Sequence, residues 1–403
     1  MAVRADGPRV VVTGLGLVLP QGAGPAAADA VFAGRSAVRR LPAIAGLPDA
    51  TGAAATDFVP LPGTECADRS VQFAVSAGVQ AWAAARLAEV PSDPHRVATI
   101  VSLSKGCLGT LARIREHDGQ AADLWSQAAP DAAGRAIVRH LQLGGLVMAP
   151  VTACASGGHA LALGAMLLRR GVVDVALVGA AEASLHPLVL GSYHRMGVLA
   201  PPGEDPATSV RPFSASRRGF AIGEGAGILV LETEASARRR GAEPLAEVRG
   251  WAAGSQAAGL TDMEPRGEAM ACLMTEALRR AGAGPEDVDY INAHGTATIQ
   301  NDLAEAAAIR TAFGRAADRV SVSSTKAAHG HLLGAATAVE LVLTVMAMTR
   351  GCVPPTANLT DPDPRIGLDC TPRTARRRPI RCALKMASGF GGHMLAVVLG
   401  RPW

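Results

Sequence analysis

Short runs of β-branched and other apolar residues alternate along the chain with longer Ala- and Leu-rich segments of helical periodicity. This alternation is typical of strands and crossover helices in an α/β fold. The pattern predicts strands at residues 10–12, 97–101, 173–178, 227–231, 288–292, 320–323 and 394–399. It predicts helices at residues 71–88, 156–170, 265–281, 302–313 and 333–349.

The chain divides into two parts that each carry strand–helix–strand patterns. A loop rich in Pro, Gly and polar residues covers 200–218, and a basic stretch at 238–244 follows the next apolar segment. We therefore expect a boundary near residue 245, with an N-terminal half at 1–245 and a C-terminal half at 246–403. A chain of 403 residues is long enough to bury a large core. Neither a short repeat nor a heptad pattern is present, which excludes solenoid and fibrous folds.

Composition and charge exclude several classes of protein. Hydrophobic residues make up 49% of the chain and charged residues 18%, a globular balance. The formal charge of +4 is too small to indicate nucleic-acid binding. Basic residues nevertheless cluster, and Arg217 and Arg218 are the two that we expect to face an acidic protein partner. The alternative is that these arginines pair within the protein and meet no partner.

The cysteines and the apolar segments indicate a cytoplasmic protein. Seven cysteines are scattered without a C-x-x-C pair, so we expect neither a disulfide scaffold nor a bound metal. The first residues run directly into a strand-like segment without the apolar run of a signal peptide. The longest apolar stretch, 332–348, contains Glu340 and is shorter than the roughly 20 residues that span a bilayer.

One cysteine lies where a nucleophile would be expected. Cys154 is part of the segment VTACASGGH at 151–159, in which a strand end leads into a helical pattern that begins near Ser156. A sulfur at a helix N-terminus meets the positive end of the helix dipole, which favours the thiolate, and the small neighbours leave room for a thioester. Free cysteines are also common core residues, so this segment alone does not establish a site.

Two further turns in the C-terminal half carry histidines. His294 lies in INAHGTAT at 291–298, and Lys326 and His331 lie in SSTKAAHGH at 323–331. A lone histidine is most often a structural residue. Two histidines and a lysine at strand-to-helix turns, with a cysteine at an equivalent turn in the other half, are hard to explain by packing. Together they predict a catalytic site.

Four segments form an ordered set of motifs. They are TACASG at 152–157, NAHGTAT at 292–298, Thr325-Lys326 with Gly330-His331, and GFGG at 389–392. This set resembles that of the elongating β-ketoacyl synthases, and the likeness runs from the first strand to the last. The resemblance implies a thiolase-like α/β fold, in which two similar halves pack as five α-β-α-β-α layers, and usually a dimer.

The resemblance implies a role for each matching catalytic residue. Cys154 would accept an acyl group from a carrier-protein pantetheine thioester. His294 and His331, as neutral imidazoles, would stabilise the enolate formed when a malonyl extender loses CO₂. Lys326 would pair with the carboxylate of Glu305 and so hold the histidine loops. Glu340 would have a structural role.

The resemblance also implies how substrates are bound. Phe390 would be a gate beside the cysteine, with Gly389 and Gly391 giving its loop freedom to move. The amides of Cys154 and Phe390 would form an oxyanion hole. The hydroxyls of Thr296 and Thr298 would hydrogen-bond the pantetheine arm, although local turn stabilisation also explains them. We expect no cofactor beyond the arm of an acyl-carrier protein, which would be the main partner.

The chain departs from the family pattern around the gate. The family commonly has Asn-Ser-Phe where this chain has Met386-Ala387-Ser388, and commonly has Asn at the position of Met394. A second loop, typically Asp-x-x-His-x-Thr, reads QAAGLT at 256–261. The catalytic set is intact while the gates differ, which suggests a specialised, polyketide-like pathway with an unusual acyl chain or carrier.

Three alternative functions each differ from an elongating synthase in one feature of the catalytic residues. A non-catalytic chain-length-determining subunit typically lacks the cysteine, a thiolase needs a second cysteine in the C-terminal glycine loop, and the initiating synthases pair cysteine with histidine and asparagine. Two alternatives stay open. One is acyl transfer or intramolecular aldol cyclisation without elongation. The other is that the chain works as a subunit of a heterodimer with a chain-length-factor-like protein instead of as a homodimer.

Overall fold

A computed structural model describes residues 7–42, 46–47, 49–87, 93–117 and 122–402. Within these residues one large mixed sheet runs in the order β12-β11-β15-β16-β10-β1-β9-β7-β5-β6, with β2 paired to β1. Its strands are β1 (Val10–Leu19), β2 (Gly22–Ala23), β5 (Val97–Leu103), β6 (Val147–Met148), β7 (Val175–Glu182), β9 (Gly225–Thr233), β10 (Ala246–Ser255), β11 (Tyr290–Asn292), β12 (Ser321–Ser323), β15 (Cys382–Ser388) and β16 (His393–Gly400).

The sheet consists of two groups of strands with the same order and directions. In the first group β1 is antiparallel to β9, β9 is antiparallel to β7, and β7, β5 and β6 run parallel. In the second group β10, β16 and β15 are successively antiparallel, and β15, β11 and β12 run parallel. The groups meet where Val10–Val12 pair with Ala246–Val248. The two groups therefore present equivalent strand ends to one region of the molecule.

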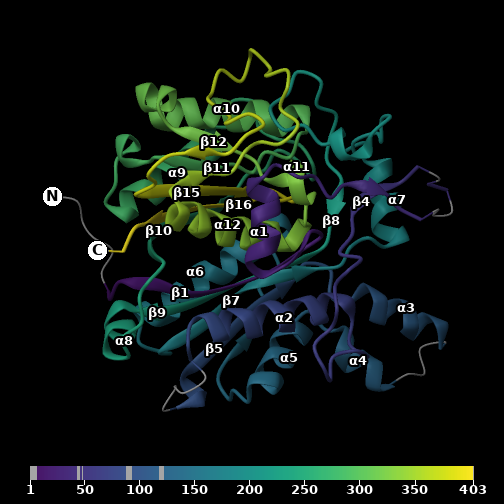
Figure 1. Cartoon of the computed structure of the whole chain (residues 1–403), viewed down its shortest axis with the longest axis vertical. Coiled ribbons are helices and arrows are strands. Elements are labelled where there is room, and N and C mark those ends of the chain that lie inside the picture. Colours follow the sequence, from purple (N-terminus) through teal and green to yellow (C-terminus); the bar gives the residue numbers. More distant parts are fainter. Residues whose placement is uncertain (1–6, 43–45, 48, 88–92, 118–121, 403) are drawn as a thin grey trace.

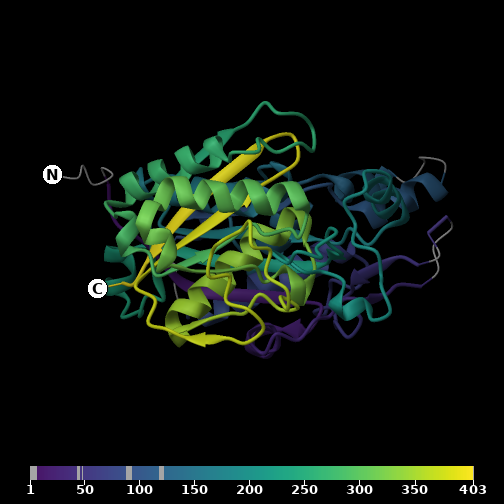
Figure 2. The same cartoon turned by 90° about the horizontal axis from the view of Figure 1, so that it is seen from above.

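Helices form three layers around these strands, as Figures 1 and 2 show. The helices α2 (Arg69–Ala84) and α5 (Ala132–Leu141) share an apolar cluster with the first group of strands. On the second group lie α9 (Glu268–Ala281) and α10 (Ile299–Phe313). Between the groups lie α6 (Ser156–Arg169) and α12 (Ala336–Arg350), whose side chains form the central core. The five layers expected from the resemblance are thus present.

Smaller elements complete the described part of the chain. The helices are α1 (Gly24–Phe32), α3 (Leu108–Glu116), α4 (Ala122–Ala128), α7 (Pro187–Arg195), α8 (Glu234–Arg239) and α11 (Lys326–His329). The strands are β3 (Arg39–Arg40), β4 (Thr51–Ala53) and β8 (Ile222–Gly223) in one small sheet, and β13 (Cys352–Val353) and β14 (Arg376–Arg377) in another.

One helical segment among the described residues, Leu333–Arg350, is apolar and long enough to cross a membrane by length and composition. Of this segment, 83% is buried inside the protein. A helix that is apolar on nearly every side is buried in the core of a large domain. The segment is therefore the central helix of the fold, preceded by one short turn.

Most expected elements are present, and two long strands of the large sheet were missed. The seven expected strands and five expected helices all overlap observed ones, although the first expected helix ends at Ala84, and residue 88 lies outside the described residues. The missed long strands are β10 and β15, and the strands of two or three residues were missed as well, namely β2, β3, β4, β6, β8, β13 and β14. Both long strands contain Ala, Gly, Lys or Met in place of a β-branched run, and their strand conformation comes from neighbours on both sides.

Candidate active site

Cys154 lies in a strained turn that directly precedes α6. The 3₁₀ turn Ala153–Ala155 contains Ala153 at a φ of 49°, a left-handed conformation that is unfavourable for a residue with a side chain. The Ser156 hydroxyl accepts from the Thr152 N–H at 2.9 Å and donates to the Ala153 carbonyl at 2.7 Å. The Thr337 hydroxyl on α12 donates to the Cys154 carbonyl at 2.6 Å. The turn is thus fixed from its own helix and from the neighbouring one.

Burial dominates the protonation of this cysteine. It raises the pKa of the Cys154 thiol to about 11, although the cations of Lys105 and Lys326 act in the opposite direction. The sequence suggested that the helix N-terminus would favour the thiolate, but in the folded protein the thiol is the main form at neutral pH. The reactive thiolate is a minor species whose population rises with pH.

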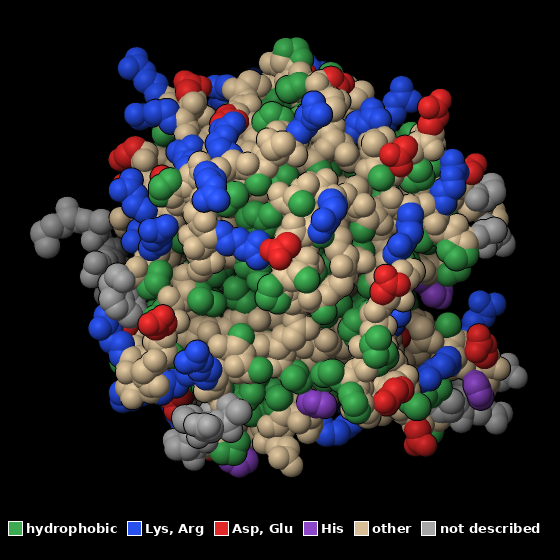
Figure 3. Space-filling model, viewed as in Figure 1, with side chains coloured by type: hydrophobic (Ala, Val, Ile, Leu, Met, Phe, Trp, Pro, Cys, Tyr) green, Lys and Arg blue, Asp and Glu red, His purple; other side chains and the backbone are tan. Residues whose placement is uncertain are grey.

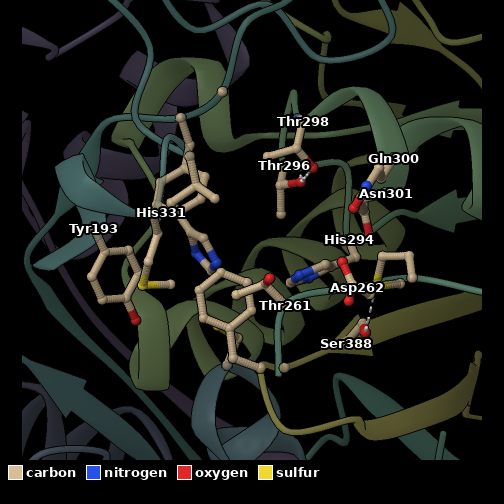
Figure 4. Close-up of a pocket in the computed structure, with 18 of the residues that line it drawn as sticks. Tyr193, Thr261, Asp262, His294, Thr296, Thr298, Gln300, Asn301, His331 and Ser388 are labelled. Carbon is tan, nitrogen blue, oxygen red and sulfur yellow. Dashed lines mark hydrogen bonds between the residues drawn. The ribbon is translucent and has the colours of Figure 1, made fainter. Parts of the chain in front are cut away.

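His331 follows a tight turn and has a defined tautomer. Gly330 has a φ of 73°, and the His331 N–H donates to the Ala221 carbonyl at 2.7 Å. The Leu333 N–H donates to Nδ1 of His331 at 3.3 Å. Because Nδ1 accepts this bond, the neutral ring carries its proton on Nε2. Figure 4 shows the ring pointing into the cavity, where this N–H can donate to a substrate oxygen.

His294 lies in the loop after β11. A carboxylate binds the backbone N–H groups of this loop, and an ammonium binds its carbonyl. The N–H groups of His294 and Gly295 donate to the two oxygens of Glu305, at 2.6 and 2.8 Å. The His294 carbonyl accepts from Nζ of Lys326 at 2.5 Å. The imidazoles of His294 and His331 face each other with ring centroids 5.5 Å apart and planes at 81°. Two rings from separate loops thus converge on one volume.

Both imidazoles are neutral at physiological pH. Burial lowers the pKa of His294 and of His331 well below 6.5, and the Lys326 ammonium is the next largest cause for both rings. Neutral imidazoles donate hydrogen bonds without carrying charge, as the sequence-based interpretation of the two histidines assumed.

The expected pairing of Lys326 with Glu305 is wrong. The Nζ of Lys326 lies 2.5 Å from Oε1 of Glu340 on α12, and all atoms of both side chains are buried. Glu305 on α10 has both oxygens occupied by the backbone amides of the His294 loop. Glu340 is therefore the counter-ion of Lys326, and Glu305 supports His294 through its main chain.

Sequence reasoning missed a second buried lysine at this carboxylate. Lys385 on β15 lies 2.7 Å from Oε2 of Glu340 and donates to the Ala293 carbonyl at 3.0 Å. The available signal was a lysine within the largely apolar run 382–388. A lysine at the centre of a buried strand needs a charge partner, because an unpaired buried cation is very costly.

The three principal residues, Cys154, His294 and His331, line one cavity of about 560 Å³. Thr296, Thr298, Gly389, Phe390 and Arg218 also reach it, whereas Gly391 is not among the lining residues. An aromatic wall closes one side, where Tyr193 lies 5.7 Å from Phe390 and 6.1 Å from Phe220 between ring centroids. The structure thus brings most of the expected residues together.

The two threonines face the cavity and also contact each other. Their hydroxyls are 2.8 Å apart, and Figure 4 shows them side by side at the start of α10. Thr296 also accepts from the Thr298 N–H at 3.4 Å, which is the local turn stabilisation considered as the alternative. A hydroxyl engaged in this way still has acceptor capacity for a ligand.

The glycine loop lies against the cysteine turn. A Cβ placed on Gly389 would be 3.0 Å from both the Cys154 nitrogen and the Thr152 oxygen, so any larger residue would crowd the cysteine turn. Gly391 and Gly392 have φ values of 82° and 83°, which a side chain would strain. The loop that carries Phe390 therefore lies directly beside Cys154 and has two residues in a conformation that favours glycine.

The two altered gating segments contact each other. The side-chain amide of Gln256 donates to the sulfur of Met263 at 3.4 Å, and the Ser388 hydroxyl lies 3.9 Å from the same sulfur. All three residues line the cavity. The small Ser388 in place of the family's usual phenylalanine removes a ring from this wall.

Arg217 was wrongly expected to face a partner. Its side chain is buried, with Nη1 2.7 Å from Asp363 and Nε 3.6 Å from Asp302, so the alternative of internal pairing is correct for this residue. Arg218 is exposed and lines the cavity. Basic side chains are scattered over the face in Figure 3, with acidic ones among them.

Known proteins resemble this chain along most of its length. The family model for the β-ketoacyl synthase N-terminal domain matches residues 8–237, and the model for the C-terminal domain matches 245–360. The tetracenomycin polyketide synthase ketoacyl synthase alpha subunit of Streptomyces glaucescens is 36% identical over 98% of this chain and 97% of that protein. The oxytetracycline polyketide putative β-ketoacyl synthase 1 of Streptomyces rimosus is 34% identical over 98% of both.

Solved structures give the same result. A type II polyketide synthase ketosynthase in complex with its acyl-carrier protein has a TM-score of 0.91 and 32% identity, covering 98% of this chain and all of that one (100%). The ishigamide ketosynthase/chain length factor has a TM-score of 0.88 and 31% identity, with the same coverage of 98% and 100%.

Proposed function

The chain belongs to the β-ketoacyl synthase family of acyltransferases, and on that premise we propose that it elongates an acyl chain in a polyketide-like pathway by decarboxylative Claisen condensation. The observation that carries this proposal is the convergence of a cysteine and two neutral imidazoles on one cavity. A thiol accepts acyl groups, and neutral imidazoles stabilise an enolate. This set matches both halves of the reaction.

Acyl transfer is the first half. The Cys154 thiolate attacks the carbonyl carbon of an acyl thioester, and the carbonyl oxygen receives hydrogen bonds from the amides of Cys154 and Phe390. The close approach of Gly389 to the cysteine turn supports this oxyanion hole. The new carbon–sulfur bond forms as the bond to the carrier sulfur breaks, and the carrier leaves as a thiolate that takes up a proton.

Condensation is the second half. A malonyl thioester loses CO₂, and its electron pair moves into an enolate whose oxygen accepts hydrogen bonds from His294 and His331. The tautomer of His331, with its proton on Nε2, supports this role. The enolate carbon attacks the acyl carbon on Cys154, the carbon–sulfur bond breaks, and the free cysteine is regenerated. The Lys326–Glu340 pair and Glu305 keep the histidine loops in place.

We propose that the substrates arrive on the pantetheine arm of an acyl-carrier protein and that the enzyme uses no other cofactor. Thr296 and Thr298 would hydrogen-bond the arm, and exposed Arg218 would attract the acidic carrier. A cytoplasmic location fits the seven free cysteines, since disulfides are rare in that reducing compartment.

An apolar edge of the sheet supports a dimer. Among the described residues β6 pairs with β5 alone, and nearby Leu146, Met148 and Val151 are 42%, 37% and 48% exposed. Exposed apolar residues on an edge strand mark a protein interface. We propose that a second copy or a chain-length-factor-like subunit covers this edge, three residues from the nucleophile.

Intact-mass analysis tests the function directly. The enzyme is incubated with candidate acyl carriers and malonyl carrier, alone and with a chain-length-factor-like protein. We expect an acyl adduct on Cys154 and then a carrier product longer by two carbons. A cyclised product of unchanged carbon number, or transfer of the acyl group without loss of CO₂, would establish instead the acyl-transfer or cyclisation alternative.

A further inference from the structure

Two buried lysines share one buried carboxylate beneath the His294 loop. Lys326 and Lys385 occupy different oxygens of Glu340, at 2.5 and 2.7 Å, and none of the three side chains is exposed. With both lysines protonated, this cluster has one positive charge in excess. Burying charge is costly, and an apolar side chain of similar size would fill the space of Lys385 without that cost. Packing alone therefore does not explain Lys385.

The second lysine binds the backbone that presents His294. The Nζ of Lys385 lies 3.0 Å from the Ala293 carbonyl and 3.4 Å from the Asn292 carbonyl. Lys326 takes the next carbonyl, that of His294, and Glu305 takes the amides of His294 and Gly295. Three successive carbonyls are thus held by cations and two successive amides by an anion. Such contacts fix where the loop directs its imidazole.

We propose that Lys385 is a positioning residue for His294 in the condensation step, acting through the carbonyls of the His294 loop and through Glu340. This inference rests on the proposed function. It assigns to β15 a part in the reaction beyond its place in the sheet.

The charge of Lys385 also acts on the ring. After burial, the cations that lower the pKa of His294 are Lys326, His331 when protonated, and Lys385. The charged or titratable groups around the loop come from five places: Lys326 on α11, Lys385 on β15, Glu305 on α10, Glu340 on α12, and His331 before α12. Replacing Lys385 by a neutral residue leaves one lysine against Glu340, so the pKa of His294 should rise.

Lys385 has a titration of its own that gives the test a signature. Burial lowers the pKa of Lys385 to about 8, against the attraction of Glu340. Below that pH the wild-type lysine is charged, and above it the lysine is neutral. The electrostatic effect on His294 should therefore differ between wild type and a variant with a neutral residue at this position. The difference should be largest below pH 8 and become smaller above it.

The test uses the full-length enzyme with Lys385→Met, which is neutral and of similar length, and Leu384→Met as the control on the same buried strand. Acylation of Cys154 is measured by intact mass, and malonyl decarboxylation and condensation are measured from pH 5 to 9. For Lys385→Met we expect acylation within about twofold of wild type, because Lys385 contacts Glu340 and the His294 loop and not the cysteine side chain. We expect kcat for decarboxylation to fall roughly 10- to 100-fold with little change in KM, since misplacement of a catalytic group costs about that much. The acid limb of the pH–rate profile for decarboxylation should move to higher pH.

The outcomes distinguish a failure of the proposed function from a failure of the positioning role of Lys385. If wild-type enzyme acylates but neither decarboxylates malonyl carrier nor elongates, the proposed function fails whatever Lys385 does. If wild type elongates and Lys385→Met keeps both its kcat and its acid limb, the positioning role is overturned. Should Lys385→Met not fold, carbon-13 labelled histidine in the wild-type enzyme gives the answer, with the His294 signal assigned by its loss in His294→Ala. That signal should respond near pH 8 as Lys385 loses its proton, and a signal that does not respond overturns the inference.

Discussion

The two halves of the sheet place different chemistry at equivalent strand ends. Cys154 lies between the outer strand β6 and the central helix α6. His331 lies at the equivalent place in the second half, between the outer strand β12 and the central helix α12. After β5 come Ser104 and Lys105, and after β11 comes His294. One topology, used twice, thus brings a cysteine from one half and two imidazoles from the other to the same cavity.

The charges behind these residues differ between the halves. Behind the cysteine, Lys105 lies 3.7 Å from Glu182 and its side chain is 24% exposed. Behind the histidines, Lys326, Glu340 and Lys385 are all fully buried. The duplicated backbone determines where these groups lie, burial is the largest influence on their pKa values, and the charges packed behind each strand end modify that influence.

The largest expected effect comes from removing the nucleophile. Cys154→Ala should abolish acyl transfer while leaving the melting temperature nearly unchanged, because alanine fits the turn and the cysteine makes no side-chain hydrogen bond that must be replaced. Intact-mass analysis after incubation with acyl carrier measures this. An acyl adduct on the variant would show that the N-terminal half does not supply the nucleophile.

Removing a histidine should affect only the second half of the reaction. His294→Ala and His331→Ala should each keep the acylation of Cys154 and lose about 10²- to 10³-fold in condensation, since one donor to the enolate oxygen is lost. Single-turnover experiments should show acylated enzyme accumulating. Full elongation in either variant would remove that histidine from the mechanism, and equal losses in acylation and condensation would indicate a structural role.

Two glutamates beneath the histidine loops should differ in their effect on stability. Glu340→Gln leaves two buried lysines without their counter-ion and should cost about 3–5 kcal/mol of unfolding free energy. Glu305→Gln keeps one acceptor oxygen for two backbone amides and should cost about 1–3 kcal/mol. Chemical denaturation at pH 7 compares the variants. A larger loss of stability in Glu305→Gln than in Glu340→Gln would indicate that Glu305 is the main charge partner of Lys326.

The pH dependence of the two half-reactions should differ. Since burial raises the pKa of Cys154 to about 11, the thiolate fraction and the acylation rate should rise about tenfold per pH unit between pH 6 and 9. Burial lowers the pKa of both histidines well below 6.5, so they stay neutral when the pH falls through 6.5, and decarboxylation by pre-acylated enzyme should not drop there. The acylation rate is measured with a small pantetheine thioester as the acyl donor. An acylation rate that does not change with pH would mean that thiolate formation does not limit the reaction.

Local patterns in the sequence were sufficient to predict the alternating strands and helices, and the family resemblance implied the five-layer fold and the residues of the candidate site. A cysteine or histidine in a small-residue turn after a strand is visible in one segment, and so is the helix that follows it. The partner of Lys326 was not predictable in this way. Glu305 and Glu340 both lie on helices after the histidine motifs, and only packing decides which carboxylate meets the ammonium.

Long-range contacts also explain the other errors. Arg217 and Arg218 are adjacent in the sequence, yet one is buried against Asp363, 146 residues away, and the other faces the cavity mouth. Lys385 was overlooked because its strand has no β-branched run and its significance depends on Glu340 and on the His294 loop. Burial and charge pairing are properties of the assembled layers, which a single sequence does not display.

The smallest expected effect concerns Arg218, the exposed arginine at the cavity. Arg218→Glu should lower carrier-dependent acylation about fivefold at low salt and leave acylation by a small pantetheine thioester unchanged, because charge steers the approach of an acidic carrier and not the chemistry. The difference should fade as added salt shortens the Debye length from about 10 Å at 0.1 M toward 3 Å at 1 M. Arg139→Glu, an equal charge change at an exposed position on α5, is the control. Arg217→Glu cannot serve here, since it would place a third carboxylate beside Asp302 and Asp363 and unfold that region. An equal loss with both acyl donors would mean that Arg218 shapes the cavity and does not receive the carrier.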